Sequence, residues 1–531
     1  MRMPETIGLL FEGCMAGDTA AVTELLDKDA SLAAASWGYF TPLHFAVRGG
    51  HDELVELLLR YGADASEQPC LSWQDSLLQK AQDRGHDSVV KLLREHLQRT
   101  LKVEPIGEKL AALIRDRKLR ELLELLEQHP EAIHASDERG NTPLHWAVMT
   151  RQLELIDRLL IMGADPLAKR GDGSQPAQLA LEGDYFYRAN RNLPQDASRD
   201  TSFLLGYLIG RGGVPCDLFL AAATGDAMRV DELLKQNEAL ANSRDASGRS
   251  ALYYAAKRGY AEVVKRLLAA GADPNAAERD AARGAALYAA VRGKHTACVK
   301  LLLAHGADPN AEVEASGNAV YAALQEGNQE LIELVYAYGG NVTLTGACAL
   351  GRIDLVGELL AANPSSIDGG DYGPLAQAAS CGFTAIVKLL LRHQAPLSEP
   401  WYASNYMHYA CSYADADMVK LLLEGGADPN HTNWLGVSYL HLIALQGKLE
   451  LAELMIVHGA DLGAVDKEHE TTPLGWAAKY GKSDMVSYLL QQGAEAEPAG
   501  VPQWATPLAW AQRRGHQAIA EQLLAHRSAA V

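Results

Sequence analysis

Hydrophobic residues recur at helical spacing in two short segments of residues 141–166. In the first segment the apolar positions, which fall at i, i+3 and i+4, are Leu144, Ala147 and Val148. In the second they are Leu155, Ile156, Leu159 and Leu160. Thr142 is suited to cap the first helix, Pro143 fits its first turn, and Gly163 ends the second helix. A helix pair with one apolar face cannot bury that face alone, so the pattern predicts stacked copies.

Copies of this helix pair recur along almost the whole chain of 531 residues. We index each copy by the residue that follows the last turn of its second helix. This gives sixteen repeats, indexed by Asp29, Gly62, His96, His129, Gly163, Gly212, Asn237, Gly271, Gly306, Gly339, Asn363, Gln394, Gly426, Gly459, Gly493 and Arg527. Most spacings lie between 31 and 35 residues, and the exceptions are 49, 25 and 24.

Two motifs mark these repeats. A T-P-L-H-x-A motif spans Thr41–Ala46 and Thr142–Ala147, and shorter forms begin at Thr472 and Thr506. A Gly-Ala-Asp ending recurs at Gly62, Gly163, Gly271, Gly306, Gly426 and Gly459. With a period near 33, the sequence resembles ankyrin repeat proteins. The resemblance implies an all-α fold, an ankyrin-repeat solenoid of stacked helix–turn–helix units with β-turn fingers, and says little about function.

The irregular spacings predict four segments, at residues 1–103, 104–215, 216–343 and 344–531. The two short spacings each lack about nine residues, the length of the finger before a first helix. The long spacing comes from an insertion at 184–200 between the two helices of one repeat. The sequence leaves open whether the superhelix breaks or only kinks at the segment joins.

Charge and cysteine content narrow the class of protein. The net charge of −19 argues against a general binder of nucleic acid or of anionic membranes. The seven cysteines are scattered without C-x-x-C spacing, which favours free thiols in a reducing compartment. No apolar run approaches the length of a membrane span, and the N-terminus is too acidic for a signal peptide. We therefore expect a cytoplasmic protein.

The chain carries none of the phosphate-binding, dinucleotide-binding, nucleophile-elbow or zinc-protease motifs, so we expect no enzyme and no cofactor. One repeated slot holds His44, His145, His408 and His441. These histidines are too far apart to share a metal ion, and we expect hydrogen bonds within their own turns. The next slot holds Trp146, Tyr409, Trp476 and Trp510, for which we expect core packing.

Aromatic residues also occupy positions at which the repeat fold does not require an apolar residue. Trp401, Tyr402 and Trp434 lie on fingers, and Tyr413 and Tyr480 end first helices beside the concave groove. Exposed tryptophan and tyrosine are typical of interface hot spots, so these residues are candidate anchors for a partner protein. The alternative is that neighbouring finger aromatics stack on each other for stability.

The groove slot is often basic. The candidate cations are Lys257, Arg258, Lys479, Arg513 and Arg514. A basic stripe in an acidic protein is suited to an acidic segment of a partner. The alternative is that these cations only offset the dipole at the end of each first helix.

The leading interpretation is thus a non-catalytic scaffold that binds a partner segment in the groove and on the fingers. An enzyme or small-molecule binder is the other candidate, with a pocket formed at a segment join by the insertion. Tyr185, Tyr187, Arg188 and Arg191 would line that pocket, unless the loop merely covers a wall of the groove. The partner's identity and the oligomeric state stay open.

Overall fold

The structure is a computed structural model that describes residues 5–37, 40–66, 74–182, 200–212, 214–245, 248–278, 284–313, 317–368, 373–397, 406–413 and 415–529. Its contacts divide the chain into two compact modules. Residues 2–341 form the N-terminal module, and residues 342–531 form the C-terminal module.

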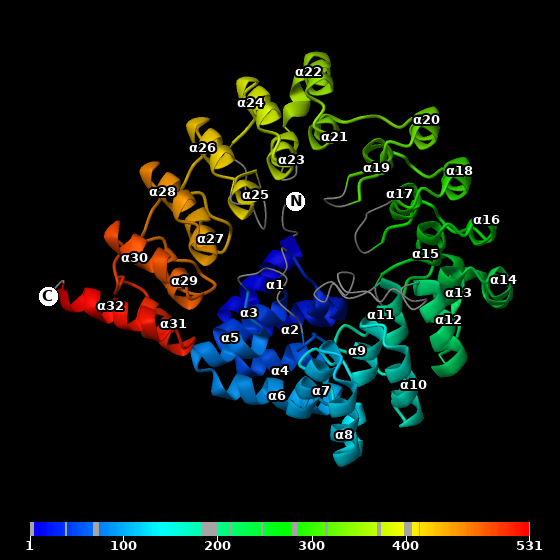
Figure 1. The fold of residues 1–531 in the computed structure, drawn as a ribbon, viewed down its shortest axis with the longest axis horizontal. Coiled ribbons are helices and arrows are strands. Elements are labelled where there is room, and N and C mark those ends of the chain that lie inside the picture. Colours follow the sequence, from blue (N-terminus) through cyan, green and yellow to red (C-terminus); the bar gives the residue numbers. More distant parts are fainter. Residues whose placement is uncertain are drawn as a thin grey trace. The chain divides into compact units, whose positions relative to one another are not determined.

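The N-terminal module consists of paired short helices in chain order (Figure 1). They are α1 (Glu5–Ala16), α2 (Thr19–Lys28), α3 (Pro42–Gly49), α4 (Asp52–Arg60), α5 (Leu77–Arg84), α6 (Asp87–Leu101), α7 (Pro105–Arg115), α8 (Leu119–Gln128), α9 (Pro143–Met149), α10 (Leu153–Ile161), α11 (Pro176–Glu182), α12 (Thr201–Gly212), α13 (Leu218–Thr224), α14 (Ala227–Gln236), α15 (Ala251–Arg258), α16 (Ala261–Ala269), α17 (Ala285–Arg292), α18 (Thr296–Ala304), α19 (Ala319–Glu326) and α20 (Gln329–Ala337).

The C-terminal module continues the same pairing. Its helices are α21 (Leu344–Ala349), α22 (Ile353–Ala362), α23 (Pro374–Ser380), α24 (Thr384–Arg392), α25 (Tyr406–Ser412), α26 (Ala416–Glu424), α27 (Tyr439–Gln446), α28 (Leu449–Val457), α29 (Pro473–Lys479), α30 (Ser483–Gln491), α31 (Pro507–Arg513) and α32 (Gln517–Ala529). Within each module first helices pack on first helices and second helices on second helices, as in α15 on α17 and α16 on α18.

The helix start at Thr41 and the helix end at Gly163 follow the pattern in the sequence. Thr41 accepts a hydrogen bond from the backbone N–H of His44, 3.3 Å away, and Pro42 opens the helix. Gly163 has a φ of +97°, which a side chain rarely tolerates, and follows the last turn of α10. The apolar faces of α9 and α10 lie in one core, and the all-α ankyrin-repeat fold is confirmed.

Four repeats share a variant form. In them a 3-10 helix follows the second helix: η1 (Ala30–Ala34), η2 (Pro130–His134), η5 (Glu238–Asn242) and η7 (Pro364–Ile367). Their first helices α1, α7, α13 and α21 open the four segments expected from the irregular spacing. The division into four segments itself stays a prediction.

Ser136 ties the end of α6 to the start of α7. Its hydroxyl donates to the carbonyl oxygen of Leu101 at 2.5 Å, and its carbonyl accepts from the N–H of Glu104 at 3.3 Å. A Cβ atom at Gly107 would lie 2.0 Å from the carbonyl oxygen of Ser136. The join near residue 104 is therefore closely packed.

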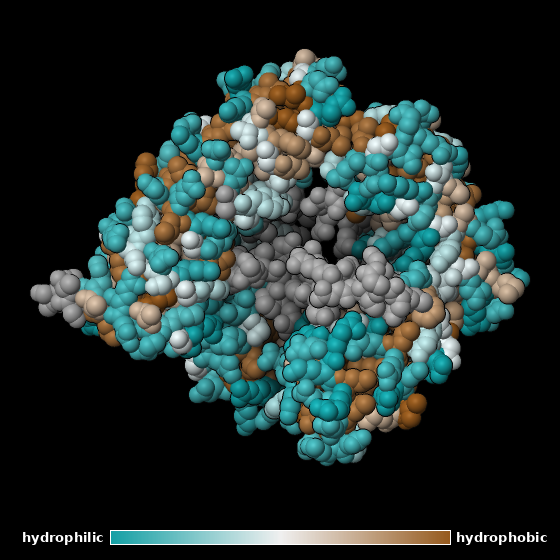
Figure 2. All heavy atoms as spheres, in the orientation of Figure 1, coloured by the Kyte–Doolittle hydropathy of each residue, from teal (hydrophilic) through white to brown (hydrophobic). Residues whose placement is uncertain are grey.

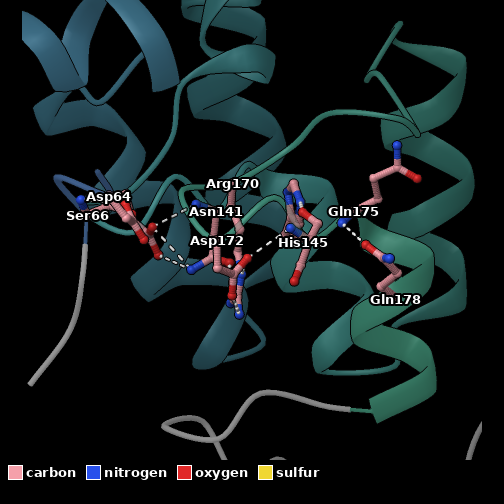
Figure 3. A network of polar contacts seen from close by, with 10 residues as sticks. Asp64, Ser66, Asn141, His145, Arg170, Asp172, Gln175 and Gln178 are labelled. Carbon is pink, nitrogen blue, oxygen red and sulfur yellow. Dashed lines mark hydrogen bonds and ion pairs between the residues drawn. The ribbon is translucent and has the colours of Figure 1, made fainter. Parts of the chain in front are cut away.

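A polar network connects the loop after α4 with the finger before α11 (Figure 3). Arg170, which is buried, donates to both carboxylate oxygens of Asp172, at 2.9 and 2.5 Å, and to the side-chain oxygen of Asn141 at 3.2 Å. A Cβ atom at Gly171 would lie 1.6 Å from the Ser66 hydroxyl oxygen. These contacts hold the first two predicted segments together away from their covalent join.

Figure 2 shows mostly hydrophilic side chains on the visible face, with hydrophobic residues in short patches between them. The most exposed large hydrophobic residues, Ile161, Met228 and Val457, lie on second helices or on the turns beside them and are far apart in the sequence. Within the described ranges no helix is both long enough and apolar enough to span a bilayer.

Candidate functional site

Two of the repeated histidines, His145 and His441, form hydrogen bonds with their own turns and with the following finger. In the C-terminal module the N–H of Ser438 donates to Nδ1 of His441 at 3.2 Å, while Nε2 lies 3.2 Å from the carbonyl oxygen of Thr471. An Nδ1 atom that accepts leaves the proton on Nε2, which donates to that carbonyl. His145 has the same contacts with Thr142 and Ser174, so the predicted structural role is confirmed for both histidines.

The tryptophans in the next slot are core residues, as predicted. Trp476 and Trp510 are fully buried, and Trp146 is almost so. Sequence reasoning missed the acid that binds Trp476: the indole N–H of Trp476 donates to the carboxylate of Asp466 at 2.8 Å. The indole of Trp146 donates to Asp137 at 2.7 Å. The recurrence of an aspartate nine or ten residues before the aromatic residue is the signal that could have revealed this link.

Tyr413 is the predicted anchor that lies most openly on the surface. It follows the last turn of α25, and 66% of its side chain is exposed. Its ring stacks on the half-buried ring of Tyr409, with centroids 6.4 Å apart and planes 11° apart. Two further predicted anchors, Trp401 and Tyr402, lie outside the described residues.

Trp434 and Tyr480 are both half-buried in the C-terminal module. Trp434 lies on the finger before α27, and Tyr480 follows the last turn of α29. The Tyr480 ring lies 6.1 Å from that of Trp476, centroid to centroid. These two side chains are therefore partly exposed, whereas most of the Tyr413 side chain is exposed.

Lys479 does not face an open groove, which corrects the expectation from the sequence. It is 3% exposed, and its ammonium lies 3.2 Å from both ring nitrogens of His469. A position at equal distance from both nitrogens lies over the ring face. The ammonium also lies 4.7 Å from the ring centroid of Trp510 and 5.1 Å from that of Tyr480, so aromatic faces stabilise this charge inside the module.

Arg513 and Arg514 are half-buried on the same tryptophan. The guanidinium of Arg513 lies 4.6 Å from the ring centroid of Trp510, and that of Arg514 lies 5.4 Å from it. Arg513 also donates to the carbonyl oxygen of Trp504. Both arginines thus pack on an aromatic ring and keep part of their surface in solvent.

The basic pair of the N-terminal module ends α15. Lys257 and Arg258 are half-buried, and the Lys257 ammonium lies 5.1 Å from the ring centroid of Tyr253. The residues of the alternative pocket, Tyr185, Tyr187, Arg188 and Arg191, lie outside the described residues, between α11 and α12.

Burial governs the titration of the repeated histidines. It lowers the pKa of His145, His408 and His441 to about 4, even though nearby carbonyl oxygens favour the protonated form of His145 and His441. These residues are therefore neutral at physiological pH. Among the described residues, no group of three or more His, Cys, Asp or Glu side chains is arranged to hold a metal ion.

Stacked helix pairs joined by fingers define a repeat solenoid, and the residues that recur at the same position of its repeats stabilise the fold. The family model for ankyrin repeats in three copies matches residues 10–104, 204–278, 344–433 and 440–531. The model for the single ankyrin repeat matches residues 139–170 and 285–312. The chain belongs to the ankyrin repeat family.

Several characterised proteins are similar over part of the chain. Human ankyrin repeat and SOCS box protein 16 is 35% identical over 105 residues, which are 20% of this chain and 23% of that protein. Mouse oxysterol-binding protein-related protein 1 is 32% identical over 187 residues, 30% of this chain and 19% of that protein. Ankyrin repeat protein nuc-2 of Neurospora crassa is 30% identical over 177 residues, 30% of this chain and 16% of that protein. The chain thus spans less than a quarter of each relative.

Proposed function

We propose that the protein is a non-catalytic scaffold that recognises a segment of a partner protein on the C-terminal module. The observation that carries this proposal is the 66% exposure of Tyr413, whose ring is nevertheless held by stacking on Tyr409. A ring ordered before binding loses little entropy when a partner covers it. Tyrosine is one of the residues enriched in interface hot spots.

The chemistry of the partner follows from the residues around the C-terminal end of this module. Trp434 and Tyr480 offer further aromatic surface, and Arg513 and Arg514 keep charged surface in solvent. These groups suit a segment that combines apolar side chains with carboxylates. Lys479 is left out of this surface because it is buried.

The net charge of −19 favours a protein partner over nucleic acid. The six cysteines in the described ranges are free thiols, which supports a reducing compartment such as the cytoplasm. The ankyrin family serves mainly in protein–protein contact, and its presence here agrees with the same role.

Affinity capture from native lysate with chemical cross-linking tests the proposal. Tyr413→Ala should reduce recovery of the partner at least tenfold, because it removes an anchor without opening a core cavity. The matched control is Tyr336→Ala, which removes an exposed tyrosine from the second helix α20. Equal recovery with both variants would refute the role of Tyr413.

A further inference from the structure

Residues 115–120 form a basic run in an acidic chain. The run covers the last residue of α7, the turn that follows it and the start of α8. Its exposed side chains are one acid, Asp116, and the four cations Arg115, Arg117, Lys118 and Arg120, whereas the whole chain has a net charge of −19. A basic patch attracts acidic ligands, so the surroundings of each cation decide what the patch can bind.

Lys118 and Arg120 have acidic partners at the start of α8 itself. The Lys118 ammonium lies 4.0 Å from a carboxylate oxygen of Glu121, and the Arg120 guanidinium lies 3.7 Å from one of Glu124. Pairs three and four residues apart are ordinary on an exposed helix surface. The helix α8 therefore accounts for these two cations.

Arg115 and Arg117 lie against the next repeat instead. The guanidinium carbon of Arg115 lies 4.8 Å from the ring centroid of Trp146, and Nη2 of Arg117 donates to the carbonyl oxygen of Thr150 at 3.0 Å. Trp146 and Thr150 are four residues apart, so they lie on the same side of α9, toward its C-terminal end. Both guanidinium groups are thus anchored at one place in the fold.

A later repeat shows what a pair of cations at these two positions binds. Arg292 ends α17 as Arg115 ends α7, and Lys294 has a φ of +59° as Arg117 has one of +56°. One carboxylate of the following repeat bridges this later pair. Its two oxygens, both of Glu326, lie 2.6 Å from the Arg292 guanidinium and 3.0 Å from the Lys294 ammonium.

Thr150 stands where the following repeat would supply that acid to Arg115 and Arg117. It comes directly before a residue of positive φ, as Glu326 does, but it has no carboxylate. Among the described residues, no carboxylate oxygen lies within 4.0 Å of either guanidinium, that of Asp116 included. The fold therefore repeats the two cations of the bridge without the acid between them.

We propose that Arg115 and Arg117 bind a carboxylate in an acidic segment of a partner protein, which takes the place that Glu326 has in the later repeat. Both arginines are exposed, so a ligand can reach them from solvent. Each is held on one side, by an indole ring or by a carbonyl oxygen, and therefore loses little entropy when a ligand binds. Guanidinium groups also form paired hydrogen bonds with a carboxylate, which an ammonium group does not.

This surface lies in the N-terminal module, so it is independent of the recognition proposed for the C-terminal module. To keep the two apart, the full-length chain carries Arg513→Gln and Arg514→Gln in every titration. Three fluorescent peptides of one framework are compared, with glutamate at alternate positions, with glutamine at those positions, or with a single phosphoserine among the glutamines. Fluorescence anisotropy at about 0.1 M salt, where the Debye length is about 10 Å, reports affinity. We expect the glutamate peptide to bind at least tenfold more tightly than the glutamine peptide.

Arg117→Gly is the decisive variant. The residue at this position has a positive φ and is glycine in other repeats, at Gly50 and Gly259 for example, so glycine fits the backbone there. The variant should remain folded, as circular dichroism will show, and should lose at least tenfold in affinity for the glutamate peptide. Arg115→Gln should lose as much.

Arg120→Gln is the matched control, because it removes the same charge from a side chain that Glu124 already pairs. It should bind the glutamate peptide as tightly as the chain without this exchange. Full affinity in a folded Arg117→Gly variant, or an equal loss in the Arg120→Gln control, would overturn the proposal. Tighter binding of the phosphoserine peptide than of the glutamate peptide would overturn the assignment to a carboxylate.

Discussion

Trp476 donates its indole N–H to the carboxylate of Asp466 across 2.8 Å inside the C-terminal module. Asp466 also accepts from the backbone N–H groups of Glu468 and His469, at 2.7 and 2.6 Å. The finger that runs from Asp466 to Pro473 is one residue longer than the finger from Asp137 to Pro143. Glu470, which lies in the longer finger, has a φ of +53°. The bond from the helix to the carboxylate fixes how the finger folds over the first helix.

Removal of that indole donor should destabilise the C-terminal module. Trp476→Phe leaves a buried carboxylate without one of its donors, which should cost about 1–3 kcal/mol of unfolding free energy beyond the lost packing. Trp510→Phe is the matched control, because Trp510 is equally buried and its indole N–H has no acceptor among the described residues. Denaturant unfolding followed by circular dichroism measures the difference. Equal losses in the two variants would contradict the role of the bond.

Acid should destabilise both modules through their buried histidines. A histidine whose folded pKa is about 4, against about 6.5 unfolded, contributes stability that is complete above pH 6.5 and is lost as the pH falls toward 4. Between pH 7 and pH 5 each such residue should cost the folded state about 2 kcal/mol.

His441→Gln isolates one of these contributions. Glutamine at this position still accepts from the N-cap N–H, as in a capping box, but it does not titrate. Amide hydrogen exchange in α27 at pH 7 and pH 5, corrected for intrinsic rates, should show a smaller loss of protection in the variant than in the wild type. An unchanged loss would mean that His441 is charged in the fold.

Two helical glycines should respond in opposite ways to alanine. Gly107→Ala places a Cβ atom 2.0 Å from the carbonyl oxygen of Ser136, so the join near residue 104 must open. Gly206→Ala in α12 meets nothing within 4 Å and should stabilise by about 0.5–1 kcal/mol. Thermal melting separates the two, and a stabilised Gly107→Ala variant would show that the join is loosely packed.

The sequence predicted the structural features that every repeat requires. The cap at Thr41, the stop at Gly163 and the buried histidines at His145 and His441 all follow from a local pattern that the chain repeats many times. Repetition made these predictions strong because each copy tested the same interpretation. The spacing also located the insertion between α11 and α12.

The repeated pattern could not predict which basic residues at the ends of first helices are buried and which are exposed. Lys479 and Lys257 occupy the same register at the ends of their first helices, yet Lys479 is enclosed by His469 and Trp510 while Lys257 stays half-buried. The difference comes from a finger one residue longer and from a tryptophan in the next repeat. The contact between Arg151 and Thr201 likewise joins residues fifty positions apart, which no local pattern encodes.

Site-directed photo-cross-linking at residue 413 tests the central claim most directly. Tyr413 is replaced by a photoreactive phenylalanine analogue, and Val457, a highly exposed residue of the second helix α28, is replaced in the control. If the C-terminal module recognises a partner through Tyr413, irradiation in native lysate should join residue 413 to one defined protein and give no such product at residue 457. The Arg513→Gln and Arg514→Gln exchanges should weaken that product together. Cross-links of equal yield at both positions, or none at residue 413, would contradict the account.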